Sequence, residues 1–236
     1  KIKKQGAIDL SRKKEYNALS SNKEEGISMR IVFLGTAGYH PNETRHTTSV
    51  IIPEIGFVLD AGTGFFRARD LIETKHLDIF LSHAHLDHLQ GTTYLLNVLW
   101  KKNVPNENVT IWGKADHLDY LIDHIFGSPG FPVEFENQGW RALPVSEMFS
   151  VRGVQVETRI LPHPGLSVGY RLTFPDGKVL AYIMDTTTSG EQLPLMQNAD
   201  LCIHECNFPD QLAGLPTSSE EWAEKTGHST TSRVNE

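Results

Sequence analysis

Cysteine is scarce in this chain, and so are long apolar runs. Only Cys202 and Cys206 occur among 236 residues, and their spacing lacks the context of a zinc ribbon or a redox pair. Two free thiols fit a reducing compartment, so we expect a cytoplasmic protein. No apolar run approaches the length of a transmembrane helix, and no apolar segment follows the basic first residues. We therefore expect neither a membrane span nor a secretory signal.

Positive charge is also in short supply outside the first residues. The formal net charge is −7, and residues 1–28 hold seven basic and four acidic side chains. Residues 1–28 thus carry +3, and the remaining residues carry about −10. This negative net charge of residues 29–236 argues against a large nucleic-acid-binding surface. Bound divalent cations would offset this charge locally, so a small anionic substrate remains compatible with it.

The first 28 residues differ from the rest of the chain. They are polar, highly charged and weakly periodic, which predicts a flexible or marginally helical extension. An interaction tail is the alternative to a solvated arm. From Met29 onward, apolar runs alternate with turn signals. We therefore expect one domain over residues 29–236, a size that one folded unit can have.

Two kinds of apolar pattern alternate in residues 29–236. Short apolar runs predict strands at Ile31–Gly35, Ser49–Pro53, Phe57–Asp60, Asp78–Ser82, Val109–Trp112, Val154–Leu161, Ser167–Phe174, Lys178–Met184 and Asp200–His204. Longer segments predict helices at Gly64–Glu73, His88–Lys102 and Ala115–Phe126, a short one before residue 200 and a last one from near Ser218. Residues 127–150 are expected to be a loop with short strands. Both halves mix strands with helices, which predicts an α/β fold with two mixed sheets face to face and helices outside, a four-layer αββα sandwich.

The densest chemical signal is His83-Ala84-His85-Leu86-Asp87-His88, directly after a predicted strand. In an extended segment, His83 and His85 project to the same side and can hold one cation together. Asp87 and His88 follow where the chain should turn, and they can reach a second cation. Imidazole and carboxylate ligands without thiolate suit zinc first, then manganese or iron. The alternative is a polar turn that happens to be rich in histidine.

A predicted hairpin adds two further candidate ligands. Pro175-Asp176-Gly177 is a turn signal between the predicted strands Ser167–Phe174 and Lys178–Met184. His163 precedes the first strand and Asp185 follows the second, so both should lie at the open end of the hairpin. His163 can complete a set of three imidazoles, and Asp185 can bridge the two cations with one oxygen to each. Taken singly, His163 is compatible with a loop histidine and Asp185 with a helix cap.

Several stretches together resemble one known family. The His83–His88 motif, the stretch from His163 to Arg171 and the strand end at Asp185 resemble the metallo-β-lactamase fold superfamily. Within it, they are similar to the phosphodiesterase branch that contains ribonuclease Z. The segments Phe33-Leu34-Gly35-Thr36 and Leu59-Asp60-Ala61-Gly62 also resemble that branch. The resemblance implies the αββα fold and a phosphodiesterase with two metal ions.

The resemblance also implies roles for residues outside the first motif. Asp60 would support a ligand histidine by accepting an imidazole N–H, although a strand-end turn former is the alternative. His204-Glu205-Cys206-Asn207 resembles a His-Glu-Ala-Thr segment, and His228-Ser229-Thr230 matches a His-Ser-Thr segment. By this likeness, His228 is the general acid and Glu205 its partner. Without the likeness, His228 would be interpreted as an ordinary residue at a helix start.

Two departures from the branch limit what it implies. Asp185 follows His163 by only 22 positions, so the long arm that grips tRNA in ribonuclease Z is absent at that position. The spacing is similar to that of small-substrate members such as 5-phosphoribosyl 1,2-cyclic phosphate phosphodiesterase. The family's last metal-ligating histidine has no counterpart, because the chain ends eight residues after His228. We expect this domain to be incomplete at its C-terminus and to bind its second metal weakly.

These observations together predict a metal-dependent hydrolase. We expect a hydroxide shared by two divalent metal ions to attack a small or cyclic phosphodiester or an RNA end. A short RNA or small phosphodiester is the expected partner, with a homodimer left open. A thioesterase or lactonase of the same fold is one alternative, because such enzymes share the first motif. A metal-binding interaction module without catalysis, using the basic arm of residues 1–28, is the other.

Overall fold

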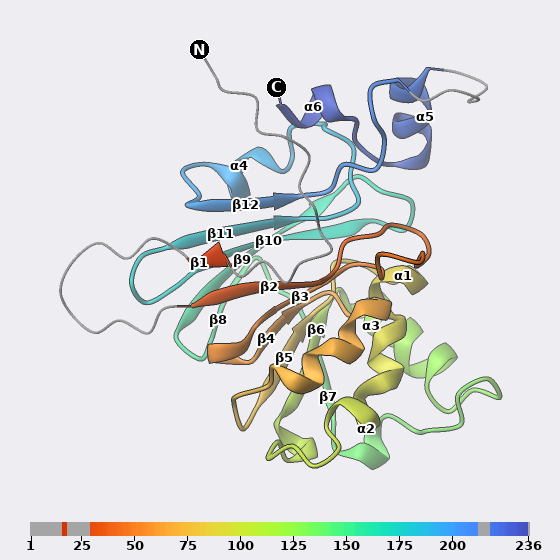
Figure 1. The fold of residues 1–236 in the computed structure, drawn as a ribbon, viewed down its shortest axis with the longest axis vertical. Coiled ribbons are helices and arrows are strands. Elements are labelled where there is room, and N and C mark those ends of the chain that lie inside the picture. The colour runs from red at the N-terminus through yellow and green to blue at the C-terminus, as the bar shows by residue number, and fades with distance from the viewer. Residues whose placement is uncertain (1–15, 18–28, 212–217, 236) are drawn as a thin grey trace.

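Two sheets lie face to face in the computed structural model, which describes residues 16–17, 29–211 and 218–235 (Figure 1). The larger sheet is ordered β1 (Tyr16–Asn17), β2 (Arg30–Gly35), β3 (Ser49–Ile52), β4 (Phe57–Leu59), β5 (Leu77–Phe80), β6 (Val109–Gly113) and β7 (Arg141–Pro144). The smaller sheet is ordered β12 (Leu201–His204), β11 (Val179–Ile183), β10 (Ser167–Thr173), β9 (Val154–Leu161) and β8 (Met148–Val151).

Both sheets are mixed, as the sequence predicts. In the larger sheet, neighbouring strands are antiparallel from β1 to β4 and parallel from β4 to β7. In the smaller sheet, β8 to β11 are antiparallel and β12 runs parallel to β11. Of residues 1–28, only Tyr16 and Asn17 are described, and they pair with Ile31 and Arg30. The rest of the predicted extension lies outside the described residues.

Alternate side chains along the strands serve different hydrophobic cores. Val50 and Ile52 of β3 pack between the two sheets, whereas Ile51 packs under the helices of the larger sheet. Because strand side chains alternate in direction, a slip of one residue would exchange the two cores. On the outer face of the smaller sheet, Ile183 packs with Leu195 of α4 (Leu193–Met196). The layers therefore run helix, sheet, sheet, helix, which confirms the predicted αββα sandwich.

An aromatic cluster between the sheets anchors the end of β5. The Phe80 ring lies 5.0 Å from Phe57, 5.8 Å from Tyr170 and 6.0 Å from Trp112, centroid to centroid. Aromatic pairs at such distances contribute about 0.5–1.5 kcal/mol each beyond the area they bury. Phe80 is fully buried, and the His83–His88 segment begins three residues later. Packing between the sheets thus fixes the starting point of that segment.

The predicted helix over residues 88–102 is wrong as a single element. The structure divides it into α1 (Leu86–Leu89), a 3₁₀ segment (Gln90–Tyr94) and α2 (Leu95–Val98). The interruption lies at Gly91, whose N–H donates to the carbonyl of Ala61 at 2.6 Å. A Cβ at Gly91 would lie 2.3 Å from the carbonyl oxygen of Gly62. The loop after β4 therefore packs directly against the helix backbone, which cannot continue as a regular α-helix.

Two other predicted helices are also modified. Residues 64–73 were expected to be helical, but the structure has a 3₁₀ helix at Thr63–Asp70. Its start is held by Thr63, whose N–H donates to Thr47 Oγ1 at 2.7 Å. The helix predicted over residues 115–126 ends as α3 at Ala115–Tyr120 and continues as a π-helix at Leu121–Ile125. The wider turn brings Phe126 against Phe131 and Phe135, with both ring pairs 5.2 Å apart.

The remaining predicted elements are confirmed with small shifts at their ends. Residues 127–150 contain β7, most of β8 and a 3₁₀ helix at Glu136–Gln138. Two further 3₁₀ helices lie earlier in the chain, at Pro53–Ile55 and Asn106–Asn108. The predicted hairpin is formed by β10 and β11, in which Thr173 pairs with Val179. α5 (Ser219–Thr226) begins after Ser218, whose hydroxyl accepts the Glu221 N–H, and α6 spans Thr231–Asn235. Among the described residues, no helix is both long and apolar enough to span a bilayer.

Candidate metal centre

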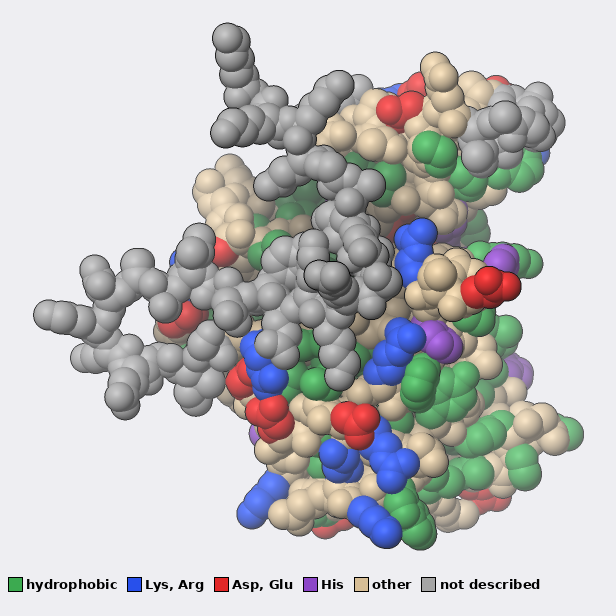
Figure 2. Space-filling view, in the orientation of Figure 1, with side chains coloured by type: hydrophobic (Ala, Val, Ile, Leu, Met, Phe, Trp, Pro, Cys, Tyr) green, Lys and Arg blue, Asp and Glu red, His purple; other side chains and the backbone are tan. Residues whose placement is uncertain are grey.

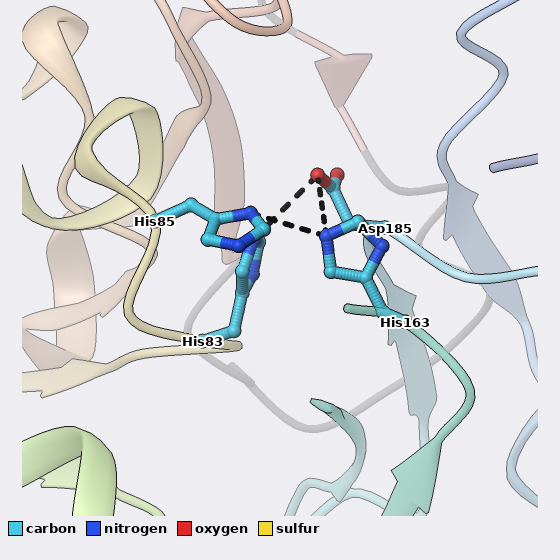
Figure 3. Close-up of side chains that lie close together, drawn as sticks. All are labelled: His83, His85, His163 and Asp185. Carbon is cyan, nitrogen blue, oxygen red and sulfur yellow. Dashed lines mark hydrogen bonds and ion pairs between the residues drawn. The ribbon is translucent and has the colours of Figure 1, made fainter. Parts of the chain in front are cut away.

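Six candidate ligands from three parts of the chain meet at one edge of the sandwich. His83 and His85 follow β5, and Asp87 and His88 lie in α1. His163 lies between β9 and β10, and Asp185 follows β11. Figure 3 shows His83 and His85 on one side, facing His163 and Asp185 on the other. Histidine side chains also reach the surface on the side of the molecule where α1 lies (Figure 2).

The first group of ligand atoms comprises three imidazoles and one carboxylate. His83 Nε2 lies 3.6 Å from Asp185 Oδ2, and His163 Nε2 lies 3.7 Å from the same oxygen. His85 Nδ1 lies 3.1 Å from His163 Nε2, and the four ligand atoms lie within 4.8 Å of one another. Tetrahedral ligands roughly 2.0–2.2 Å from a zinc ion are about 3.3–3.6 Å apart. The spacing therefore fits one divalent cation.

The second group lies next to the first and shares Asp185 with it. His88 Nε2 lies 3.3 Å from Asp185 Oδ1 and 3.5 Å from Asp87 Oδ2. Asp185 thus directs Oδ2 at the first group and Oδ1 at the second, the arrangement expected from its place at the hairpin end. Asp87 Oδ2 also accepts the backbone N–H of Tyr39 at 2.7 Å, which brings the loop after β2 to the edge of the site.

Two buried nitrogens in these groups lack hydrogen-bond partners. His83 Nε2 and His88 Nε2 are both inaccessible to solvent, and neither makes a hydrogen bond of regular geometry among the described residues, although oxygens of Asp185 lie 3.6 Å and 3.3 Å away. A buried polar atom without a partner is costly, so such atoms call for an explanation. Both nitrogens point into the groups of candidate ligands. A set of imidazole and carboxylate donors with unpaired nitrogens fits divalent metal ions.

In His83 and His163, the ring nitrogen that faces away from the other candidate ligands is hydrogen-bonded to the protein. Ser82 Oγ donates to Asp60 and accepts from His83 Nδ1 at 3.0 Å. His163 Nδ1 lies 2.9 Å from the carbonyl of Gly227 and can only donate to it. Each bond fixes the proton on Nδ1 and leaves the Nε2 lone pair directed at the other candidate ligands of the first group. His85 is the exception, since it presents Nδ1 instead.

Asp60 is the centre of the hydrogen-bond network beneath the second group. Its carboxylate accepts the Ser82 N–H at 2.7 Å, the Ser82 hydroxyl at 2.8 Å and the Tyr182 hydroxyl at 2.9 Å. His88 Nδ1 donates to the same carboxylate at 2.9 Å. Asp60 is fully buried, so it could not remain charged without these donors. The structure thus places Asp60 behind His88, where it can orient the imidazole.

Electrostatics differ between the two groups. Burial lowers the pKa of His85 and His163, and it holds the pKa of His83 well below its usual value. Neutral imidazole is the form that binds a metal. Burial alone would lower the pKa of His88 as well, but the carboxylates of Asp185 and Asp60 raise it well above its usual value. The two carboxylates around His88 thus favour a positive charge at this position.

Two of the acidic residues have unusual backbone conformations. Asp60 has φ of 54° and Asp185 has φ of 35°, both in the left-handed region. A residue other than glycine costs about 1–3 kcal/mol there, and such residues cluster at functional sites. Each follows a central strand, β4 or β11, and the turn aims its carboxylate across the strand ends. Burial alone would raise the pKa of Asp185, but His88 and His83 hold it well below its usual range.

His228 and Glu205 lie beside the first group. The His228 ring lies 5.1 Å from the His163 ring, and its Nδ1 lies 3.6 Å from Glu205 Oε1. That oxygen accepts the N–H groups of Ser229 at 2.8 Å and Thr186 at 3.3 Å. Burial alone would lower the pKa of His228, but Glu205 and Asp185 raise it, which favours the protonated imidazole. Glu205 thus holds the chain on both sides of the site as well as facing His228.

Sequence reasoning missed three residues that position the ligands. Ser82 could have been noticed, because a hydroxyl directly before a ligand histidine at a strand end is well placed to orient it. Tyr182 is an inward-facing residue of β11 and gave no signal beyond a core aromatic. Gly227 ends α5 with φ of 79°, and a Cβ there would lie 2.8 Å from His163 Nδ1. Its contact with His163 spans 64 residues, so no local pattern could reveal it.

Comparison with known proteins agrees with this geometry. A family model described as the β-lactamase superfamily domain matches residues 56–234. Ribonuclease Z of Methanosarcina mazei is 28% identical over 260 residues, covering 87% of this chain and 82% of that protein.

Solved structures share the fold. The metallo-β-lactamase fold protein YhfI of Bacillus subtilis superposes with a TM-score of 0.66 and 17% identity, covering 86% of this chain and 78% of that one. The short form of human tRNase Z gives a TM-score of 0.59 and 21% identity, covering 87% of this chain and 86% of that one. Because the family model spans most of the sequence and the sandwich is shared, the chain belongs to the β-lactamase superfamily and has the metallo-β-lactamase fold.

Proposed function

We propose that this protein is a phosphodiesterase that works with two divalent metal ions, with zinc preferred and manganese or iron as alternatives. His83, His85, His163 and Asp185 would hold one ion, and Asp87, His88 and Asp185 the other. The observation that carries the proposal is the position of Asp185, which directs one carboxylate oxygen at each group. A carboxylate shared in this way is suited to a pair of ions that act on one phosphate.

The bound ions and the side chains of the site would have separate roles in the reaction. When bound, two such ions supply an activated water at neutral pH and neutralise charge on the phosphate oxygens. His228 would donate a proton to the departing alcohol oxygen, a role supported by its raised pKa and its contact with the first group. Glu205 would keep His228 protonated and in place. Proton donation by a positioned group contributes on the order of 10²–10⁴-fold when the leaving group is poor.

A small or cyclic phosphodiester, or the end of a short RNA, is the substrate class we favour. The relative from Methanosarcina mazei is named ribonuclease Z, which supports RNA as one substrate. The connection between His163 and Asp185 is filled by the β10–β11 hairpin, which leaves no long arm there to grip a large RNA. The negative net charge of residues 29–236 also disfavours an extended nucleic-acid-binding surface. A homodimer stays a prediction.

Metal content and turnover test the proposal together. In excess zinc, we expect the chain to hold two ions per molecule, the second more weakly than the first, and to hydrolyse bis(p-nitrophenyl) phosphate. Two ions with hydrolysis of thioesters or lactones but no phosphodiester would favour the other hydrolases of this fold. One ion or none, with no turnover of any ester, would favour a binding module without catalysis.

The His228→Ala substitution tests the proton donor. We expect it to slow turnover of alkyl phosphodiesters by on the order of 10²-fold or more, and turnover of bis(p-nitrophenyl) phosphate much less, because nitrophenolate departs without a proton. His124→Ala, at an exposed histidine outside the site, is the matched control. Equal losses on both substrates would remove the general-acid role from His228.

A further inference from the structure

A small cavity has His228 in its wall, and the His228 ring lies 5.1 Å from the ring of the candidate ligand His163. The volume of the cavity is about 130 Å³. Residues 187–189, which follow the bridging Asp185 by two positions, contribute three hydroxyl side chains to it. Helices α5 and α6 contribute Glu220, Glu224 and Arg233. The wall of the cavity thus contains the residue proposed to protonate the leaving group. It also contains hydroxyl and charged side chains that have no role in the proposed mechanism.

Of the two carboxylates that line this cavity, one pairs with an arginine and the other can contact a ligand. Arg233 Nε donates to Glu220 Oε1 at 2.7 Å, so these two charges offset each other. Glu224 is exposed, and its side chain has no hydrogen bond or ion pair among the described residues. An ionised carboxylate only accepts hydrogen bonds, so a ligand that contacts Glu224 must donate to it. A phosphate group on the ligand would bring like charge against it.

We propose that this cavity binds the departing alcohol of the substrate and selects a neutral, hydroxyl-bearing group such as a ribose without a further phosphate. The inference rests on the proposed phosphodiesterase function. Hydroxyl side chains can donate to and accept from a sugar, and Glu224 accepts from its O–H groups. Drug-sized ligands occupy sites of roughly 300–1,000 Å³, so a cavity of about 130 Å³ fits one small group of this kind.

The position of His228 agrees with this assignment. Hydrolysis forms a bond from a water oxygen to phosphorus and breaks the bond from phosphorus to the alcohol oxygen. That oxygen takes a proton from His228 as it departs, and a proton released from the water restores His228. The products are a phosphate monoester and a neutral alcohol. A leaving group seated in this cavity has its oxygen beside the imidazole that must protonate it.

Three dinucleotide substrates test the selectivity on the metal-loaded protein. ApA carries no extra phosphate, pApA carries one on the first sugar, and ApAp carries one on the second. Product analysis shows which sugar departs. We expect a phosphate on the departing sugar to lower kcat/KM about tenfold relative to ApA, because one like charge at short range is worth roughly this much. A phosphate on the retained sugar should change kcat/KM by less than about twofold.

Substitutions on α5 assign the effect to Glu224. Glu224→Gln should remove most of the discrimination, and Glu224→Lys should reverse it. Glu221→Gln makes the same change of charge on the same helix outside the cavity, and it should leave the discrimination as it was. Circular dichroism and metal content verify that each variant is folded and loaded.

The outcomes separate this inference from the function on which it rests. If the wild-type chain cleaves ApA and the Glu224 and Glu221 variants discriminate as it does, the leaving-group assignment is wrong and the phosphodiesterase stands. If the chain with two bound ions cleaves neither ApA nor bis(p-nitrophenyl) phosphate, both are overturned. Discrimination that changes only with Glu224 supports the assignment.

Discussion

The two groups of candidate ligands are built differently. The first has three imidazoles and a carboxylate from three connections of the sandwich, and two of its imidazoles are held by partners at Nδ1. The second has one imidazole and two carboxylates, and its imidazole and one of its carboxylates come from neighbouring residues of α1. Four protein ligands are typical of a closed zinc site, whereas three leave a position open. If both groups bind metal as proposed, we expect the first group to hold its ion more tightly and the second to keep a position open for another ligand.

Asp185 is the residue on which both groups depend. We expect Asp185→Ala to lower metal content from two ions to fewer than one and turnover by more than about 100-fold, beyond the range typical of outer partners of metal ligands. Asp176→Ala, at the turn of the same hairpin, should leave both unchanged. Metal analysis after dialysis, with steady-state kinetics, measures the effect. Retention of two ions by Asp185→Ala would show that the groups do not share this carboxylate.

Asp60 should separate the second group from the first. Asp60→Asn weakens the acceptor behind His88, so we expect affinity for the second ion to fall by about 10–100-fold and affinity for the first to fall less. Asp78→Asn is the control, because Asp78 is also buried and pairs with Arg152 away from the site. It should reduce stability without changing metal affinity. Competitive titration with a chelator measures both affinities, and equal losses would contradict the separation.

Gly227 should act on the first group alone, with a smaller effect. A Cβ at Gly227 would lie 2.4 Å from Pro164 Cδ and 2.8 Å from His163 Nδ1, so Gly227→Ala should displace His163. We expect affinity for the first ion to fall about tenfold, at the low end for groups that orient a ligand. Gly177→Ala has a similar φ and no atom within 4 Å, so it imposes the same backbone strain without the contact. Identical effects of both variants would attribute the loss to strain.

The fold and the local part of the site were predictable from the sequence because each left a short-range pattern. The His83–His88 run lies within six residues, and the hairpin that brings His163 near Asp185 was marked by its turn. Alternating apolar runs were enough to predict the sandwich. What the sequence could not reveal depends on contacts between distant segments. The helix after His88 is interrupted because the loop at Ala61 bonds its backbone.

The supporting residues show the same limit. Asp60 was expected to support a ligand histidine, but its bonds to Ser82 and Tyr182 join three strand ends and had no local signal. Gly227 gave no signal of a supporting role, because its contact with His163 follows only from the packing of α5 against the β9–β10 connection. Residues that hold a ligand from behind are therefore harder to find than the ligands themselves.

Anomalous X-ray diffraction across the zinc edge, from crystals grown with excess zinc, would locate the ions relative to Asp185. We expect two peaks roughly 3.5–4 Å apart. Asp185 should lie between them, with Oδ2 toward His83 and His163 and Oδ1 toward His88. A single peak, or an Asp185 carboxylate turned away from both imidazole groups, would contradict this expectation.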